Sequence, residues 1–391
     1  MKIRVSGIFL LLPLLGFGQF TGSVTQGLGT TTIANLMPNC PSNHISPLGS
    51  ITSSDNKVWI VPAETRILTG PYASDLHNVC NNKTPANLAA ADLIQVPITE
   101  IDAGGELITG FLFSDNYFEL YVNGILVGAD PVPFTPFNSC VVKFRVSRPY
   151  TLAVKLVDWE ENPGLGSEIQ GANNYHPGDG GFIAQFSDGT VTNGNWKAQT
   201  FYIAPIQDLN AIAELPDGTR SSAAATLSPT CNANCYGIHY EEPLDWKNEN
   251  FNDSGWPIAK LYTAAQVTNQ AAYTNFANTA WNNASFIWSS NLILDNLVLA
   301  RYTVQDVTAA KDGFSSRARV WYQPESGLLQ WESAGRNEPG PEIRIFSLEG
   351  KEQFCRPGGE HSLNLRHLSP GIYMVKIQTG AYPVIHKILI T

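Results

Sequence analysis

The sequence has few charged residues and no cluster of basic ones. Asp, Glu, Lys and Arg make up 15% of its 391 residues, and the formal net charge is −10. Binding to nucleic acid or to an anionic membrane surface requires clustered Lys and Arg, so we expect neither as a partner. After the first 18 residues, no apolar run is long enough to span a bilayer.

Recognisable catalytic motifs are also missing. The sequence contains no G-x-S-x-G nucleophile turn, no H-E-x-x-H metal motif, no phosphate-binding loop and no intact EF-hand loop. The carboxylates of glycosidases have no fixed spacing, so these absences leave glycan hydrolysis open. We assign no catalytic residues from the sequence.

What the sequence does contain is typical of a β-rich extracellular protein. Gly and Pro are abundant, at 33 and 25 residues, and aromatic residues make up 10%. Residues 114–128 predict a β-hairpin, because Asn123-Gly124 separates two alternating runs. Phe118, Leu120 and Val122 would form its apolar face, and the other face is aromatic and polar.

The N-terminus has the layout of a secretory signal peptide. Lys2 and Arg4 precede an apolar run over residues 8–17, and small residues follow at Gly16 and Gly18. We predict a signal peptide over residues 1–18 and a mature chain that begins at Gln19. The run is short for the alternative, an N-terminal membrane anchor.

Six cysteines in an exported chain indicate disulfides rather than reduced thiols. Their pairing cannot be deduced from sequence, but two pairs are candidates: Cys231 with Cys235, and Cys40 with Cys80. The C-x3-C spacing of the first pair, without a second such pair, is poor for zinc.

The last 75 residues or so read as short strands separated by Gly and Pro turns, which predicts a small β-sandwich. The run IRIFSLEGK at 343–351, the strand LSPGIYMVKI at 368–377 and the closing KILI at 387–390 resemble the C-terminal sorting domain of type IX (Por) secretion. The usual opening of that domain is degenerate here, as Tyr322-Gln-Pro-Glu325. The resemblance implies a small Ig-like β-sandwich at 314–391, contact with the type IX secretion machinery, and a location outside a Gram-negative cell or on its surface.

The region 19–310 resembles the lectin-like, galactose-binding-type β-sandwich that precedes the catalytic domain in α-L-rhamnosidases. The matching segments are the DNYFELYVNG hairpin at 115–124, the DG…WK segment at 188–197, and the FNDSGW turn at 251–256. The IW strand at 287–288 resembles another part of that superfamily, although its position in the order differs. The resemblance implies an all-β, galactose-binding-like or jelly-roll sandwich, either one elaborated sandwich or one and a half. It stops at the ancillary domain, so no catalytic domain is expected.

Residues 158–181 form the richest polar segment, with many acids, amides and glycines. Long segments of this kind in compact domains usually carry function. A sugar site needs an aromatic face and planar polar groups for the hydroxyls. We therefore predict a carbohydrate-binding site from these residues: Asp158, Trp159, Glu160, Asn173, Asn174, Tyr175 and His176.

The same segment supports other interpretations. Asp158, Glu160 and Asp179 could together bind calcium, which would be the only cofactor. A hydrolytic site would draw two carboxylates from these acids and Glu161, with His176 as a base. The segment could also be an ordered surface loop that covers a sheet edge.

Three functions follow from these observations. The first is a secreted or surface-displayed carbohydrate-binding protein without enzymatic activity, whose partner is a glycan. The second is a glycan-acting hydrolase that uses the carboxylates of the 158–181 loop. The third is a structural or adhesive protein of the cell surface. Galactose-binding-type sandwiches have many ligands and sometimes none, so the fold does not decide among the three.

Overall fold

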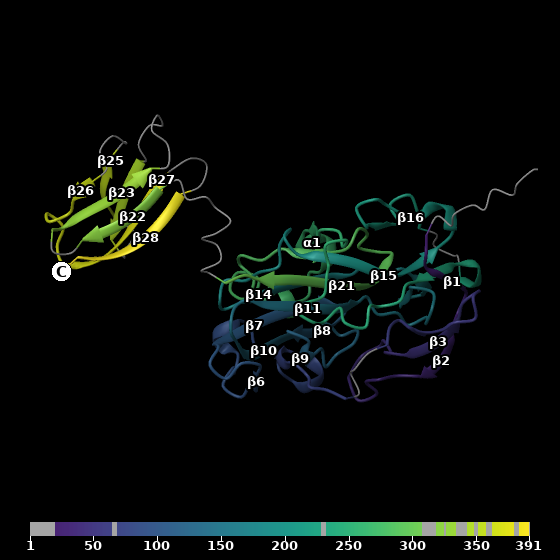
Figure 1. Cartoon of the computed structure of the whole chain (residues 1–391). Coiled ribbons are helices and arrows are strands. Elements are labelled where there is room, and N and C mark those ends of the chain that lie inside the picture. The colour runs from purple at the N-terminus through teal and green to yellow at the C-terminus, as the bar shows by residue number, and fades with distance from the viewer. Residues whose placement is uncertain are drawn as a thin grey trace, which may run out of the picture. The chain divides into compact units, whose positions relative to one another are not determined.

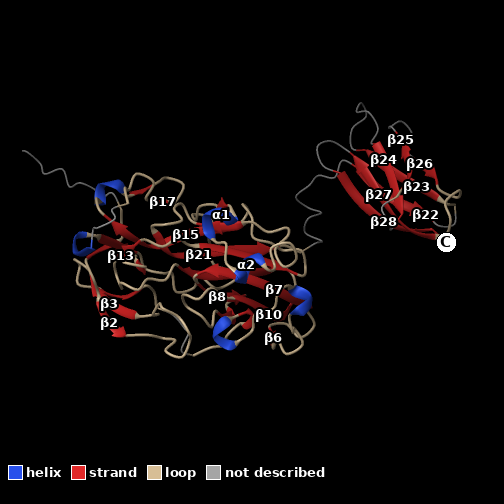
Figure 2. Cartoon of the chain, turned by 180° about the vertical axis from the view of Figure 1, so that it is seen from behind, coloured by secondary structure: helices blue, strands red, loops and turns tan. Residues whose placement is uncertain are grey.

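The computed structural model describes residues 20–64, 69–227, 232–306, 318–323, 326–333, 342–347, 351–356, 362–378 and 383–390. The chain divides into two compact units, Met1–Gln305 and Asp306–Thr391 (Figure 1). Strands dominate both units, and the few helices are short (Figure 2), so the predicted all-β fold is confirmed. The predicted signal peptide, residues 1–18, lies outside the described residues.

The first unit contains two large sheets. The strands of sheet one, in spatial order, are β1 (Ser23–Gln26), β18 (Tyr236–His239), β15 (Lys197–Ile206), β21 (Asp295–Val304), β11 (Tyr150–Val157), β8 (Tyr117–Val122) and β9 (Ile125–Ala129). Those of sheet two are β19 (Lys260–Tyr262), β20 (Phe286–Trp288), β14 (Gly181–Phe186), β7 (Glu106–Asp115), β10 (Ser139–Val146) and β5 (Ser74–His77), with β6 (Ile98–Glu100) paired to β10. All of these pairs are antiparallel except β6 with β10.

The main hydrophobic core lies between the two sheets. Successive side chains of a strand point to opposite faces, and β11 sends Leu152, Val154 and Leu156 into this core. Its intervening residues Ala153 and Val157 belong to a second core on the outer face of sheet one. Both faces of sheet one are therefore covered, which explains why every residue of β11 is buried.

Two segments build the layer over the outer face of sheet one. One is an N-terminal three-stranded sheet, whose strands are β2 (Thr30–Ile33), β3 (Leu48–Thr52) and β4 (Val58–Val61). Its Leu48, Ile51 and Val61 join the second core. The other segment follows β18 and contributes Trp246 and Trp256 to the same core. The first unit therefore has a third layer beside its two large sheets.

The predicted hairpin is present as β8 and β9. Asn123 and Gly124 form its turn with positive φ angles of 49° and 81°, as a two-residue type I′ turn requires. Phe118, Leu120 and Val122 face the main core, as expected. The opposite face of β8 turns toward the second core, so the whole hairpin strand is buried.

Short elements complete the first unit. They are the strand pairs β12 (Glu168–Gln170) with β13 (Asn173–His176) and β16 (Ala213–Glu214) with β17 (Arg220–Ser221), the helices α1 (Ala264–Val267) and α2 (Ala271–Thr274), and the 3-10 turns Val79–Asn81, Leu88–Ala90, Leu209–Ala211 and Asn232–Asn234. Within the part of the chain that is described, no helix is both long and apolar enough to cross a bilayer.

Disulfide chemistry agrees with the exported character of the chain. Cys40 and Cys80 are bonded, which confirms that predicted pair. Cys235 is also disulfide-bonded, while its predicted partner Cys231 lies outside the described residues. The thiol of Cys140 is free and buried.

The second unit is a small two-sheet domain. One sheet consists of β22 (Ala318–Gln323), β23 (Leu328–Ser333) and β26 (Ser362–Asn364). The other consists of β25 (Glu352–Arg356), β24 (Glu342–Ser347), β27 (Gly371–Gln378) and β28 (Pro383–Ile390). Alternating residues such as Ile343, Ile345 and Val375 form its own core, so the predicted C-terminal β-sandwich is present.

Candidate functional site

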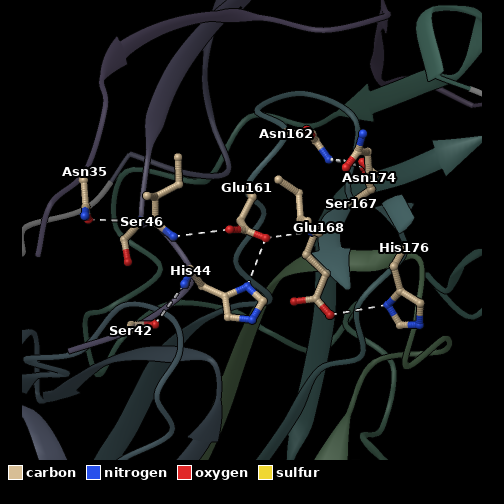
Figure 3. Close-up of polar contacts among 12 residues, drawn as sticks. Asn35, Ser42, His44, Ser46, Glu161, Asn162, Ser167, Glu168, Asn174 and His176 are labelled. Carbon is tan, nitrogen blue, oxygen red and sulfur yellow. Dashed lines mark hydrogen bonds and ion pairs between the residues drawn. The ribbon is translucent and has the colours of Figure 1, made fainter. Parts of the chain in front are cut away.

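The polar segment 158–181 is more ordered than a surface loop. It leaves the end of β11, turns through its glycines and forms the β12–β13 hairpin before it enters β14. Asn162 donates from Nδ2 to Ser167 Oγ at 3.1 Å and to the Asn174 carbonyl at 3.1 Å, which ties the two halves of the segment together (Figure 3). Asn173 accepts the Tyr175 N–H through Oδ1 at 3.1 Å, as in a local Asx turn.

The two aromatic residues that were predicted to stack on a sugar are both buried. Trp159 is 2% exposed, its Nε1 donates to the Pro47 carbonyl at 3.2 Å, and its ring meets that of Tyr117 edge-on. Tyr175 is 3% exposed, and its hydroxyl lies 3.3 Å from Cys235 Sγ. Because neither ring offers a face to solvent, this geometry does not support the stacking role predicted for them.

Glu160 holds the glycine-rich turn from inside. Its carboxyl oxygens accept the N–H groups of Gly164, at 2.7 Å, and of Gly166, and they also accept the Tyr202 hydroxyl at 3.3 Å. Burial raises the pKa of Glu160 to about 8, while these hydrogen bonds lower it. The carboxyl is occupied by the backbone, so it offers little to a sugar, a metal ion or a reaction.

A second set of polar contacts fastens the N-terminal segment to this region (Figure 3). Glu161 accepts the N–H of Ile45 at 3.2 Å and of Ile169 at 2.6 Å, and its Oε2 lies 3.1 Å from His44 Nδ1. Glu168 and His176 form a second pair at 3.3 Å across the β12–β13 hairpin. Glu161 joins segments that are far apart in sequence, and Glu168 fastens its own hairpin, so a structural role explains the contacts of both carboxylates.

Asp158 and Asp179, near the two ends of the same segment, interact electrostatically with Asp115 at the end of β7. Burial raises the pKa of Asp115 and Asp158 well above the usual range, and repulsion from Asp179 adds to both shifts. Burial likewise raises the pKa of Asp179 to about 6. Within the described ranges, no three His, Cys, Asp or Glu side chains are placed to hold a metal ion. The predicted calcium set of Asp158, Glu160 and Asp179 is therefore not assembled in this structure.

A pocket of about 820 Å³ lies elsewhere, on the outer face of sheet one. Its floor comes from β8, β11, β15 and β21, and its walls come from β4 on one side and the segment after β18 on the other. The described lining consists of Lys57, Val58, Trp59, Ile60, Pro62, Ala63, Glu64, Thr69, Glu119, Lys155, Phe201, Tyr202, His239, Tyr240, Glu241, Glu242, Pro243, Leu244, Trp246, Lys247 and Leu297. The volume is within the range of about 300–1,000 Å³ found for small-molecule sites.

A stack of three rings forms one side of this pocket. The His239 ring lies between Tyr202, at a centroid distance of 4.4 Å, and Trp59, at 5.1 Å, and all three planes are nearly parallel. Trp59 is only partly buried, whereas the other two rings are fully buried. Burial lowers the pKa of His239 to about 3, so the imidazole is neutral at physiological pH. Trp59 is thus a partly exposed ring that stacks on the buried His239 ring.

Charged groups also line the pocket. Glu119, 1% exposed, accepts the hydroxyls of Tyr117 at 3.0 Å and of Tyr121 at 2.5 Å. Its cross-strand neighbour on β11 is Lys155, which pairs with Glu242 at 2.8 Å. The pocket therefore presents hydrogen-bonding groups beside an aromatic ring.

Arg301 positions the wall that follows β18. It is 1% exposed, and its Nε lies 2.9 Å from Asp253 Oδ2. Its remaining nitrogens donate to the carbonyls of Trp246 and Asn248. The predicted turn at 251–256 is present: the Asn252 side chain accepts the Ser254 N–H, and the Asp253 carbonyl accepts the Trp256 N–H.

Sequence reasoning did not find the pocket. Its described lining comes from residues within 57–64, residue 69, and segments around residues 119, 155, 201, 239–247 and 297, and no local motif unites them. One signal was available: the outward face of the β8 hairpin strand carries Tyr117, Glu119 and Tyr121. A buried acid between two tyrosines on a sandwich strand indicates a polar site on that face.

The solved structures that resemble the chain include two bacterial β-glucuronidases. A β-glucuronidase of Faecalibacterium prausnitzii is 10% identical, with a TM-score of 0.16 over 94% of this chain and 45% of that one. A β-glucuronidase of Ruminococcus gnavus is 11% identical, with a TM-score of 0.14 over 73% of this chain and 33% of that one. The chain thus spans less than half the length of these enzymes, and similarity this weak carries no argument. No curated protein matches the sequence.

The C-terminal unit does have a family. Residues 320–391 match the secretion system C-terminal sorting domain, and the matched residues coincide with the small β-sandwich described above. The match confirms the resemblance seen in the sequence and assigns the type IX secretion machinery as a partner. The chain therefore carries a C-terminal sorting domain of type IX secretion, which directs it out of the cell or to its surface.

Proposed function

We propose that this exported chain is a carbohydrate-binding protein and that the pocket on the outer face of sheet one holds the glycan. The observation that carries the proposal is Trp59, a partly exposed ring on the wall of a large pocket that also contains charged hydrogen-bonding groups. An aromatic face that covers the apolar side of a pyranose, with polar groups for its hydroxyls, is the chemistry a sugar site requires.

Binding is favoured here over hydrolysis and over a purely structural role. The loop carboxylates of Glu160 and Glu161 are used by backbone N–H groups, so the hydrolase interpretation loses two of its acids. A purely adhesive or spacing role does not require a pocket of about 820 Å³ on a sheet face. We propose no enzymatic activity and no cofactor for this chain.

A glycan array probed with the mature chain tests the proposal, with a reducing-sugar assay on each bound polysaccharide. We expect binding without turnover, and loss of binding in Trp59→Ala. The matched control is Tyr72→Ala, because Tyr72 is 49% exposed and lies outside the described pocket lining. Binding that survives Trp59→Ala but is lost in Trp159→Ala would return the site to the 158–181 segment. Silence on the array would favour the adhesive role.

A further inference from the structure

Building on the proposed function, we infer that the pocket selects uncharged glycans and rejects those that carry uronate or sulfate groups. The charged residues that line the pocket determine this choice of ligand class. Among the described lining residues, three are lysines, Lys57, Lys155 and Lys247, and four are glutamates. The pocket thus lacks the excess of positive charge that an anionic ligand needs.

The lysines of the pocket are already engaged. Lys155 is almost buried, with its side chain 7% exposed, and its Nζ lies 2.8 Å from Glu242 and donates to the Glu64 carbonyl at 2.8 Å. Lys57 pairs with Glu241 at 3.1 Å. An anionic sugar could recruit Lys155 only by separating it from Glu242, and separating such a largely buried pair is strongly unfavourable. The Lys57–Glu241 pair is exposed and contributes much less to this barrier.

The third lysine is held by aromatic rings. Lys247 Nζ lies 4.6 Å from the centroid of Tyr121 and 5.6 Å from that of Trp246. This cation–π contact uses the faces of two rings that are themselves almost fully buried. The contact stabilises the Lys247 ammonium in its present position, so moving it to bind a ligand would cost free energy.

Glu119 on the floor adds a reason against anions. It is 1% exposed, and its two carboxyl oxygens accept hydrogen bonds from two tyrosine hydroxyls. The carboxylate or sulfate of an anionic ligand has only acceptor oxygens and therefore no proton to donate to these acceptors. A sugar hydroxyl can instead donate to a glutamate or accept from a lysine, so neutral sugars fit both kinds of partner.

The test compares neutral and acidic glycans with the full mature chain. Neutral probes are xylan and mixed-linkage β-glucan oligosaccharides, and acidic probes are oligogalacturonate, alginate and chondroitin sulfate. We expect binding to neutral probes only, with an affinity that changes less than about twofold between 50 and 500 mM NaCl, because little charge is neutralised on binding. Binding confined to acidic probes and weakened by salt would overturn this inference while supporting the proposed function. No binding to any glycan would overturn both.

The affinity of a charge variant for acidic glycans provides a second test. Glu241→Gln combined with Glu242→Gln releases Lys57 and Lys155 from their partners without changing side-chain shape. We expect the double variant to gain at least about tenfold in affinity for acidic probes, since close charge pairs contribute on this scale. Glu249→Gln, on the same segment but outside the described lining, is the matched control. If the folded double variant, checked by circular dichroism, shows no gain, the pairing argument is wrong.

Discussion

The stability of the first unit should depend on pH through His239, the buried ring at the centre of the pocket stack. Burial lowers its pKa from the ordinary value of 6.5 to about 3 in the folded chain. The unfolded chain therefore takes up a proton at a higher pH than the folded chain does. The stability that His239 contributes is fully present above pH 6.5 and is lost as the pH falls from about 6.5 toward about 3.

The size of this effect follows from the two pKa values. A pH of 5 is about 1.5 pH units below the pKa of the unfolded imidazole, and each unit corresponds to about 1.4 kcal/mol of unfolding free energy. His239 alone should therefore remove about 2 kcal/mol of unfolding free energy between pH 7.5 and pH 5. Carboxyl groups whose pKa burial has raised, such as Asp295 at about 7, act in the opposite direction. The measurement must therefore compare two proteins rather than two pH values alone.

His239→Gln supplies that comparison, because the amide stays neutral at both pH values. Urea unfolding followed by tryptophan fluorescence gives the free energy of each protein at pH 7.5 and pH 5. We expect the advantage of the wild type over the variant to shrink by about 2 kcal/mol at the lower pH. The exposed His367→Gln is the control and should follow the wild type. An advantage that is equal at both pH values would refute the reasoning.

Three further predictions concern other parts of the chain. Arg301→Gln leaves the carbonyls of Trp246 and Asn248 without their charged donor and should lower the unfolding free energy by about 3 kcal/mol. Urea unfolding measures this loss, with the exposed Arg344→Gln as the control. Equally small losses in both variants would contradict the prediction. Cys40→Ser combined with Cys80→Ser removes the disulfide that closes a loop of 40 residues and should lower the unfolding free energy by about 4 kcal/mol. A loss below about 1 kcal/mol in the same assay would contradict this prediction. Deletion of residues 306–391 should retain the chain inside the cell, and immunoblots of medium and surface fractions that still contain the truncated chain would disprove it.

Local features of the fold could be predicted from the sequence, whereas features that depend on distant segments could not. The β8–β9 hairpin was predictable because Asn123-Gly124 encodes its own turn. The C-terminal sandwich was predictable because its strands and turns follow one another in a familiar order. The layer over the outer face of sheet one was not predictable, because nothing in residues 20–64 indicates that they pack on strands far along the chain.

The candidate site shows the same division. The composition of the 158–181 segment suggested an exposed sugar site, but composition does not reveal which aromatic rings a distant segment will cover. Trp159 donates to the carbonyl of Pro47, which is 112 positions earlier. Glu119 and Trp59 meet in one pocket only because β4 is laid over sheet one.

The position of β21 has a consequence for how the chain can be cut. β21 is the last strand of the first unit in sequence, yet it lies in the middle of sheet one, between β15 and β11. A product that ends before Asp295, through early termination or proteolysis, lacks the strand that joins the two halves of that sheet, and with it Leu297 of the pocket floor. Such fragments would keep the Trp59 wall but would lack an intact sheet one beneath it. Biosynthesis must therefore pass residue 304 before any ligand can be held.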